Sequence, residues 1–336
     1  MLKLFRSNSL FLILLLIVYA GILKTAFFLF PQDIVIDFKE PLGRFFEYLL
    51  TSAHLTGHFW SVSLAFIFII LQALLLNFVV NRHKLLEEQT LLPALSYILV
   101  SSLFYEFNIF SPPLLAAFFI SWSADRILGI HKMEKADMEI FDAGLLIAVA
   151  SLFYLPSALL LIWLFISLSI QRAFNPREWI VALVGFLVPF FLAFTYFFWM
   201  DSLDYFLQEY LLINWSVIVI DISFDSFFYT KIGALLIVSI WFLMNMLQVT
   251  STGNIQIRKY NTIIISLFLL IIGAIALQPE ITLTHFYLTL IPLAVIFAYS
   301  FILPGQIEIM EIPHLLIILT ILITQYFNFA VIKNLF

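Results

Sequence analysis

Two aspartates near the start of the chain, Asp33 and Asp37, could do acid–base or metal chemistry. They follow the first long apolar run directly, and Glu40 comes soon after them. Because Asp33 and Asp37 are four residues apart, a helix would place both carboxylates on one face. A carboxylate can take a proton from an incoming hydroxyl, and paired carboxylates can hold Mg²⁺ or Mn²⁺. Ordinary solvated loop surface is the alternative interpretation of these acidic residues.

His54 and His58 form a second pair, with the i, i+4 spacing of a helical metal site. Zinc sites in proteins use at least three side-chain ligands. Two imidazoles without a third ligand on a nearby helix make half a metal site. An amphipathic role at the membrane interface is the simpler interpretation of this pair.

The composition places the elements that carry these residues in a bilayer. The 336-residue chain is 63% hydrophobic and 11% charged, with a mean hydropathy of +1.09. So much apolar surface cannot be hidden in a water-soluble core. Apolar runs of about 18 to 22 residues, long enough to cross about 30 Å of hydrocarbon, recur from end to end. We therefore expect an all-α, polytopic, single transmembrane domain over residues 1–336. The absence of cysteine excludes disulfides and a cysteine nucleophile.

Nine apolar runs have the length of full membrane spans. Between the fourth and fifth runs, Pro156 divides a segment that is too long for one span and too short for two. Two short helices, 142–155 and 157–170, could enter and leave on the same side. One long helix kinked at Pro156 is the alternative. The nine expected spans are 9–30, 58–80, 91–107, 112–130, 179–200, 232–249, 261–278, 285–303 and 312–330.

The distribution of Lys and Arg favours the hairpin and predicts the orientation. With a cytoplasmic amino terminus and a hairpin at Pro156, eleven basic residues face the cytoplasm and four face outward. A single crossing would move Arg172 and Arg177 outside, against the positive-inside rule. We therefore expect an inner-membrane protein whose carboxyl terminus is periplasmic. The eleven residues are Lys3, Arg6, Arg82, Lys84, Arg126, Lys132, Lys135, Arg172, Arg177, Arg258 and Lys259, and the four are Lys39, Arg44, Lys231 and Lys333.

The outer face in this orientation is acidic and carries two sizeable loops, residues 31–57 and 201–231. Within the first loop, residues 41–53 suit an amphipathic helix in the membrane interface, where Arg44 stands among apolar side chains. In the second loop, five carboxylates stand against the single Lys231. The lipid bilayer is the expected partner, and no nucleic-acid partner is expected.

Lys24 is the basic residue inside an expected span, about a turn and a half from its outer end. Snorkelling of the ammonium to the headgroups is one interpretation. Pairing with Asp33, or with another acidic group in a cavity, is the functional alternative. Amide side chains within the spans, such as Gln72 and Asn245, are explained by hydrogen bonds between helices.

The order of elements resembles the GT-C class of glycosyltransferases, which use polyprenyl-phosphate sugars. The stretches LLPALSYILVSSLFYEFNIFSPPLLAAFFISWSADRIL and FDAGLLIAVASLFYLPSALLLIWLF are similar to the paired helices and short glycine-bearing hairpin of those enzymes. THFYLTLIPLAVIFAYSFIL resembles their late span. More closely, most of the chain resembles a family of Bacteroidetes inner-membrane proteins of unknown function, through FDAGLLIAVASLFYLPS and NPREWIVALVGFLVPFFLAFTYFFW.

The GT-C resemblance implies inverting transfer from a polyprenyl-linked sugar or lipid precursor at the outer face. It implies that Asp33 or Asp37 is the base or a metal ligand, with Glu106 as a second carboxylate. It also implies that His285 contacts the lipid phosphate. A divalent cation is the cofactor that such a site would use.

A non-catalytic membrane subunit, acting as a scaffold in an envelope-assembly or secretion complex, is the competing class. In the glycosyltransferase interpretation, a lipid phosphate needs basic partners. Lys24, Arg44 and His285 are the residues that we expect to bind this phosphate. The small number of basic residues on the outer side favours the non-catalytic subunit. A transporter is the less favoured third class, because few polar groups lie at mid-membrane.

Reporter fusions test the predicted topology. We expect cytoplasmic signals after Lys84 and Arg177, and periplasmic signals after Asp225 and Lys333, because the hairpin keeps the two flanking basic segments on one side. Paired alkaline phosphatase and fluorescent-protein fusions measure this. A periplasmic signal after Arg177 would contradict the hairpin.

Overall fold

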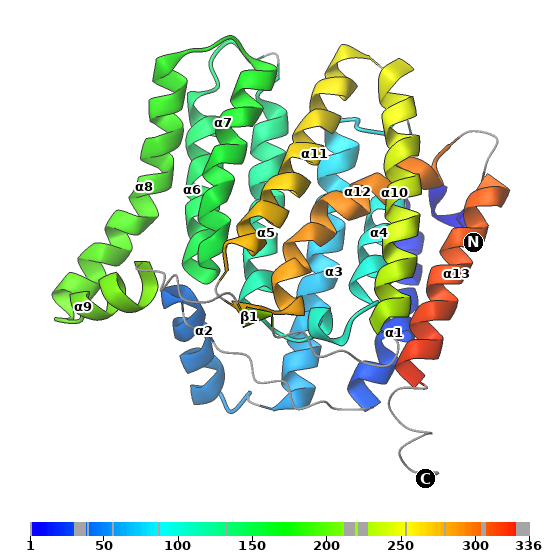
Figure 1. The fold of residues 1–336 in the computed structure, drawn as a ribbon, viewed down its shortest axis with the longest axis horizontal. Coiled ribbons are helices and arrows are strands. Elements are labelled where there is room, and N and C mark those ends of the chain that lie inside the picture. Colours follow the sequence, from blue (N-terminus) through cyan, green and yellow to red (C-terminus); the bar gives the residue numbers. More distant parts are fainter. Residues whose placement is uncertain are drawn as a thin grey trace.

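The chain folds into helices that run back and forth between two faces, as the computed structural model shows (Figure 1). One face carries α2 (Pro41–Ser52) and is called the α2 face; the other is called the opposite face. Within the described residues, one two-residue parallel pair, β1 (Val219–Ile220) with β2 (Glu280–Ile281), accompanies the helices. The all-α fold class is confirmed. The structure describes residues 2–29, 38, 40–55, 57–86, 88–131, 133–211, 219–220, 228–252, 254–278, 280–303 and 307–326.

Seven helices in the described part of the chain are long and apolar enough to cross a membrane. They are α1 (Leu10–Leu29), α3 (His58–Arg82), α8 (Pro176–Trp199), α10 (Phe228–Thr252), α11 (Ile255–Ala276), α12 (Leu290–Phe301) with the preceding turn η5 (Leu283–Thr289), and α13 (Ile307–Tyr326). The other elements are η1 (Leu4–Arg6), α4 (Leu92–Ser101), η2 (Tyr105–Asn108), α5 (Pro112–Gly129), α6 (Asp137–Phe153), η3 (Leu155–Leu159), α7 (Leu160–Gln171), α9 (Leu203–Tyr205) and the π-helical turn η4 (Phe206–Leu211).

The seven long helices coincide with seven of the nine predicted spans. The two remaining predictions, 91–107 and 112–130, correspond to α4 followed by η2 and to α5. α4 has 10 residues, which is about 15 Å of helix and too short to cross hydrocarbon alone. Seven of the described helices are therefore long and apolar enough to support a multi-pass membrane architecture.

Proline marks where several helices begin, because it lacks the N–H that the first turn leaves unbonded. Pro41, Pro112 and Pro176 start α2, α5 and α8. Ahead of α8, the Asn175 side chain accepts a hydrogen bond from the Arg177 N–H at 3.2 Å and caps the helix. The bounds of α2, Pro41–Ser52, agree with the predicted amphipathic helix of residues 41–53 to within one residue.

The segment around Pro156 is a hairpin, as predicted. η3 carries Pro156 through the turn, and α7 returns beside α6 toward the opposite face (Figure 1). The two ends are tied together, because Arg172 after α7 donates to the carbonyl oxygens of Ile130, at 3.4 Å, and Met133. A single kinked helix is excluded. The first hairpin helix starts at Asp137 rather than at residue 142.

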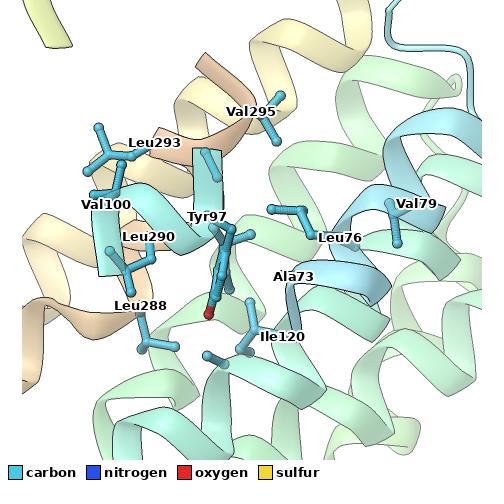
Figure 2. Packing of buried hydrophobic residues seen from close by; sticks show 14 of the residues in the cluster. Ala73, Leu76, Val79, Tyr97, Val100, Ile120, Leu288, Leu290, Leu293 and Val295 are labelled. Carbon is cyan, nitrogen blue, oxygen red and sulfur yellow. The ribbon is translucent and has the colours of Figure 1, made fainter. Parts of the chain in front are cut away.

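The core lies where α3, α4, α5 and α12 meet, and Figure 2 shows Tyr97 of α4 packed among their aliphatic side chains. α4 is buried along its whole length. At its centre, the Gln72 side-chain oxygen accepts from the hydroxyls of Tyr97 at 2.6 Å and Tyr287 at 2.9 Å, and its amide donates to the Leu114 carbonyl. Gln72 therefore makes the interhelical hydrogen bonds that were predicted for amides in spans.

The helices differ in how much protein surrounds them. The span formed by η5 and α12 is 83% buried, whereas the corresponding figures for α8 and α10 are 17% and 11%. α12 is therefore an interior helix. α8 and α10 expose apolar faces, as helices in contact with lipid do.

Charged side chains pair at the opposite face, where α3 and α5 end. Asp125 is bonded there to Arg82 at 2.7 Å and to His83 at 2.8 Å. Arg172, beyond α7, pairs with Glu178 at 3.0 Å. Basic residues that the sequence assigned to one side of the membrane thus share one face of the fold.

α6 and α8 cross at two glycines. A Cβ on Gly144 would overlap the carbonyl oxygen of Ala182, and a Cβ on Gly185 would overlap that of Phe141. Small residues let membrane helices approach this closely. The glycines therefore hold the hairpin against α8.

We expect Gly185→Ala to destabilise the protein by about 1–3 kcal/mol, because the added methyl group overpacks the crossing. The matched control is Gly273→Ala in α11, where nothing lies within 4 Å of the added Cβ and helix propensity improves. Thermal unfolding of the purified protein in detergent measures both. Equal melting temperatures for the two variants would contradict the close crossing.

Candidate functional site

Three breaks in the helices gather polar side chains at the α2 face. η2, η3 and η5 are 3-10 turns that precede or follow longer helices, and such turns often mark functional positions. η2 and η5 pack together through Phe107 and Tyr287, whose ring centroids are 5.8 Å apart. We call η2, η3 and η5, with the side chains bonded to them, the break cluster.

Within the break cluster, three side chains from distant parts of the chain meet at the turn of the hairpin. The carboxylate of Glu40, directly before α2, accepts from the Leu155 N–H at 3.4 Å. The neighbouring Tyr154 hydroxyl lies 2.8 Å from Nδ1 of His285, and their rings stack with centroids 5.5 Å apart. A carboxylate, a phenol and an imidazole can all donate, accept or pass a proton. This group is the strongest candidate site in the described residues.

Tyr210 in η4 extends this group. Its hydroxyl donates to the Ser151 carbonyl oxygen at 2.7 Å, and its ring packs with Phe206 and Leu152. Burial, and after it the nearby Glu40 carboxylate, hold the pKa of Tyr210 well above its usual range. Tyr210 is therefore a neutral hydrogen-bond donor at neutral pH.

Lys24 lies inside the protein and does not snorkel. Its Nζ donates to Ser101 Oγ at 3.0 Å and to Oδ1 of Asn108 in η2, and 1% of the residue is exposed. These two oxygens hold the amine in the interior, where headgroups do not reach it. Asp33, the partner predicted as the alternative, lies outside the described residues.

His54 and His58 lie in different elements, so they do not share the helix face that a helical metal pair would need. α2 ends before His54, which is exposed in the following turn with φ of 56°, while His58 begins α3. Nε2 of His58 lies 2.8 Å from the Phe27 carbonyl oxygen, and Nδ1 lies 3.1 Å from the Tyr105 hydroxyl. The ring therefore joins α1, α3 and η2, which accounts for His58 without a metal.

Glu106 and Arg44 lie at the α2 face in different elements. Glu106 is partly exposed in η2, and Arg44 is exposed on α2. Asp33 and Asp37 lie outside the described residues, so their closeness to Glu106 or His285 stays a prediction. In the part of the chain that the structure describes, no group of three His, Cys, Asp or Glu side chains could hold a metal ion.

Tyr154 and Tyr210 are site residues that sequence reasoning missed. Tyr154 stands two residues before Pro156, and the proline that located the turn was the signal that could have found it. Tyr210 gave no such signal, because its partners Ser151 and Glu40 are far from it in the sequence.

Comparisons with known proteins give the chain no family. No family model matches it, and neither a curated protein nor a solved structure does. The class that the fold defines is a helical, multi-pass membrane protein. Its chemistry is therefore argued from the geometry of the break cluster.

We expect Tyr154→Phe to destabilise the protein by about 1–3 kcal/mol, because it removes the hydroxyl that bonds Nδ1 of His285. The matched control is Tyr196→Phe on α8, where the residue is 59% exposed. Its effect should stay within about 0.5 kcal/mol. A double-mutant cycle of Tyr154→Phe with His285→Ala, measured by thermal unfolding, isolates the coupling. Strict additivity would show that the bond contributes nothing.

Proposed function

We propose that the chain is a GT-C-like inner-membrane protein that handles a polyprenyl-linked sugar or lipid precursor at its α2 face. The observation that carries the proposal is the meeting of two segments at the turn next to Tyr154. Glu40 comes from the loop after the first span, and His285 opens the late span. The resemblance places an acidic first loop and a late histidine at one site, and the break cluster supports that arrangement.

The proposed reaction is inverting transfer. Asp33 or Asp37 takes the proton from an acceptor hydroxyl, or holds a divalent cation that activates it, with Glu106 as a second carboxylate. The acceptor oxygen attacks the sugar carbon while the bond from that carbon to the lipid phosphate breaks. The phosphate leaves with the electron pair, and His285 and Arg44 stabilise its charge.

The proposal requires the α2 face to be periplasmic. The amino terminus is then cytoplasmic, and the basic residues at the opposite face obey the positive-inside rule. Nine full spans and one hairpin follow if α4 with η2 forms the third crossing and α5 the fourth. The ion pairs of Asp125 with Arg82 and His83 anchor the ends of α3 and α5 at the opposite face.

A non-catalytic subunit of an envelope-assembly or secretion complex is the second candidate. The observation that favours it is the exposure of α8 and α10, whose apolar faces are covered by little of the protein itself. Partner helices would fit these faces as well as lipid does. A transporter is less favoured, because a transport path needs charged or polar groups at mid-membrane, and the sequence offers few of them there.

Replacing Asp33 and Asp37 by Asn tests the enzymatic proposal. If one of them is the base, its variant should lose product by a factor of about 10²–10⁴. The matched control is Asp204→Asn, an exposed carboxylate on α9 at the same face. Envelope glycans and lipids are compared by mass spectrometry at equal protein level. Unchanged products in both variants would count against enzymatic use.

Purification in mild detergent separates the two candidate functions. Co-purified polyprenyl-phosphate lipid would support the transferase-like protein. Stoichiometric partner proteins without such lipid would support the subunit.

A further inference from the structure

The end of α4 lies inside the protein. All ten residues of α4, Leu92–Ser101, are buried, and so are Ser102 and most of η2. The carboxyl end of a helix carries a partial negative charge of about −0.5, because its last carbonyl groups lack intrahelical partners. Away from water, this charge and these oxygens need partners from the protein.

Lys24 of α1 brings its amine to this helix end. Nζ is bonded to Ser101 Oγ at 3.0 Å and to Asn108 Oδ1. Among the residues that the structure describes, no carboxylate is bonded to Nζ. The groups around the amine are neutral oxygens and the negative end of a helix, which is the environment that suits a cation.

Asn108 is oriented to present its oxygen. Its amide nitrogen donates to the carbonyl oxygens of Ser101 at 2.9 Å and Phe104 at 2.8 Å, so the side-chain oxygen must turn toward Lys24. Both donors of the amide are thereby used on the backbone of the break. Asn108 therefore satisfies the helix end and supplies a ligand oxygen at the same time.

Gln325 of α13 adds an independent observation. Its amide nitrogen donates to the Ser102 carbonyl oxygen at 2.9 Å, and the residue is 3% exposed. Its side-chain oxygen is buried and has no hydrogen-bond partner among the described residues. An unsatisfied buried acceptor costs about 1–3 kcal/mol unless a donor or cation serves it. The same helix end thus has more acceptor oxygens than the described donors use.

We propose that the break between α4 and η2 is a monovalent-cation site, and that the Lys24 ammonium occupies it as a tethered cation. Membrane proteins with interrupted helices bind Na⁺ or protonated groups at the carboxyl ends of half-helices, with unwound carbonyl and side-chain oxygens as ligands. Here two side-chain oxygens, Ser101 Oγ and Asn108 Oδ1, bond Nζ at the carboxyl end of α4. The site shares η2 with the break cluster, but its ligands are Ser101 and Asn108 rather than Glu40, Glu106 or His285. Its test measures cation-dependent stability, so it can fail while the proposed function stands.

The tethered cation fixes α1 to the break. Lys24 reaches the site from α1, so this contact joins α1 to η2 in addition to the hydrogen bonds made by His58. If the ammonium is removed, the oxygens remain and a free cation of similar size can take its place. This exchange makes the proposal testable by cation rescue.

The experiment measures thermal unfolding of Lys24→Ala in detergent with sodium, potassium, ammonium or methylammonium chloride, against N-methylglucamine chloride at equal ionic strength. Lys24→Ala should be less stable than the wild type in N-methylglucamine chloride. At least one small cation should raise its melting temperature by about 2–4 °C with saturable dependence, as ligand binding to the native state does. The wild type should show no such difference. Adding Asn108→Leu should abolish the rescue.

Two further variants keep the test decisive. Lys24→Gln keeps hydrogen-bonding capacity without charge, so it serves if Lys24→Ala does not fold, and it should show the same cation dependence. Lys259→Ala is the matched control, because Lys259 donates to the Gln171 carbonyl oxygen at the end of α7, at 3.2 Å, on the opposite face. It should show no cation dependence. Stability of Lys24→Gln equal to the wild type without small cations, or equal stability of the Lys24 variants in all five salts, would overturn the proposal.

Discussion

A backbone carbonyl or N–H that lies in hydrocarbon must find its partner inside the protein, and this requirement governs every place where a helix stops short of the membrane surface. α4 is the clearest case. Its final carbonyl groups are served by amides from other elements, Asn108 of η2 and Gln325 of α13. At the hairpin turn, the Leu155 N–H finds the Glu40 carboxylate instead. Glu40, Tyr154, Asn108 and His285 all lie where a helix is interrupted or begins, and these interruptions are where the candidate chemistry lies.

Charged side chains are stabilised differently at the opposite face and in the interior. At the opposite face, carboxylates pair with Arg or His, as the buried Asp125 does with Arg82 and His83. Lys24 in the interior has neutral oxygens and a helix end in place of a carboxylate. A buried ion pair must repay a large desolvation cost. The dipoles of Ser101, Asn108 and the end of α4 bind the Lys24 amine without bringing a second ion into the interior. The same contacts position α1 against α4 and η2.

Much of the fold could be predicted from local sequence, and little of the site could. Apolar runs marked the long helices, and Pro156 with the flanking arginines marked the hairpin, because hydropathy, proline and charge act over short stretches. Lys24 was recognised as unusual, but its partner Asn108 was not, and Tyr154 and His285 are 131 residues apart. Such contacts depend on how helices pack, which a single sequence does not encode locally. A helical metal pair is the less favoured interpretation of the i, i+4 spacing of His54 and His58, and a turn at His54 separates the two helices.

The burial of Lys24 narrows where a lipid phosphate could be held. Two of the three donors of this ammonium bond to Ser101 and Asn108, and 1% of the residue is exposed, so we leave Lys24 out of the set proposed for that role. The remaining basic groups at the α2 face include Arg44 on the exposed side of α2 and His285 beside Tyr154. Arg44 lies on α2 and His285 in η5, so a phosphate bound by both would bridge these two elements. Function at this face would then depend on the packing of α2 against the hairpin, and the glycine crossing that holds the hairpin against α8 would act on it indirectly.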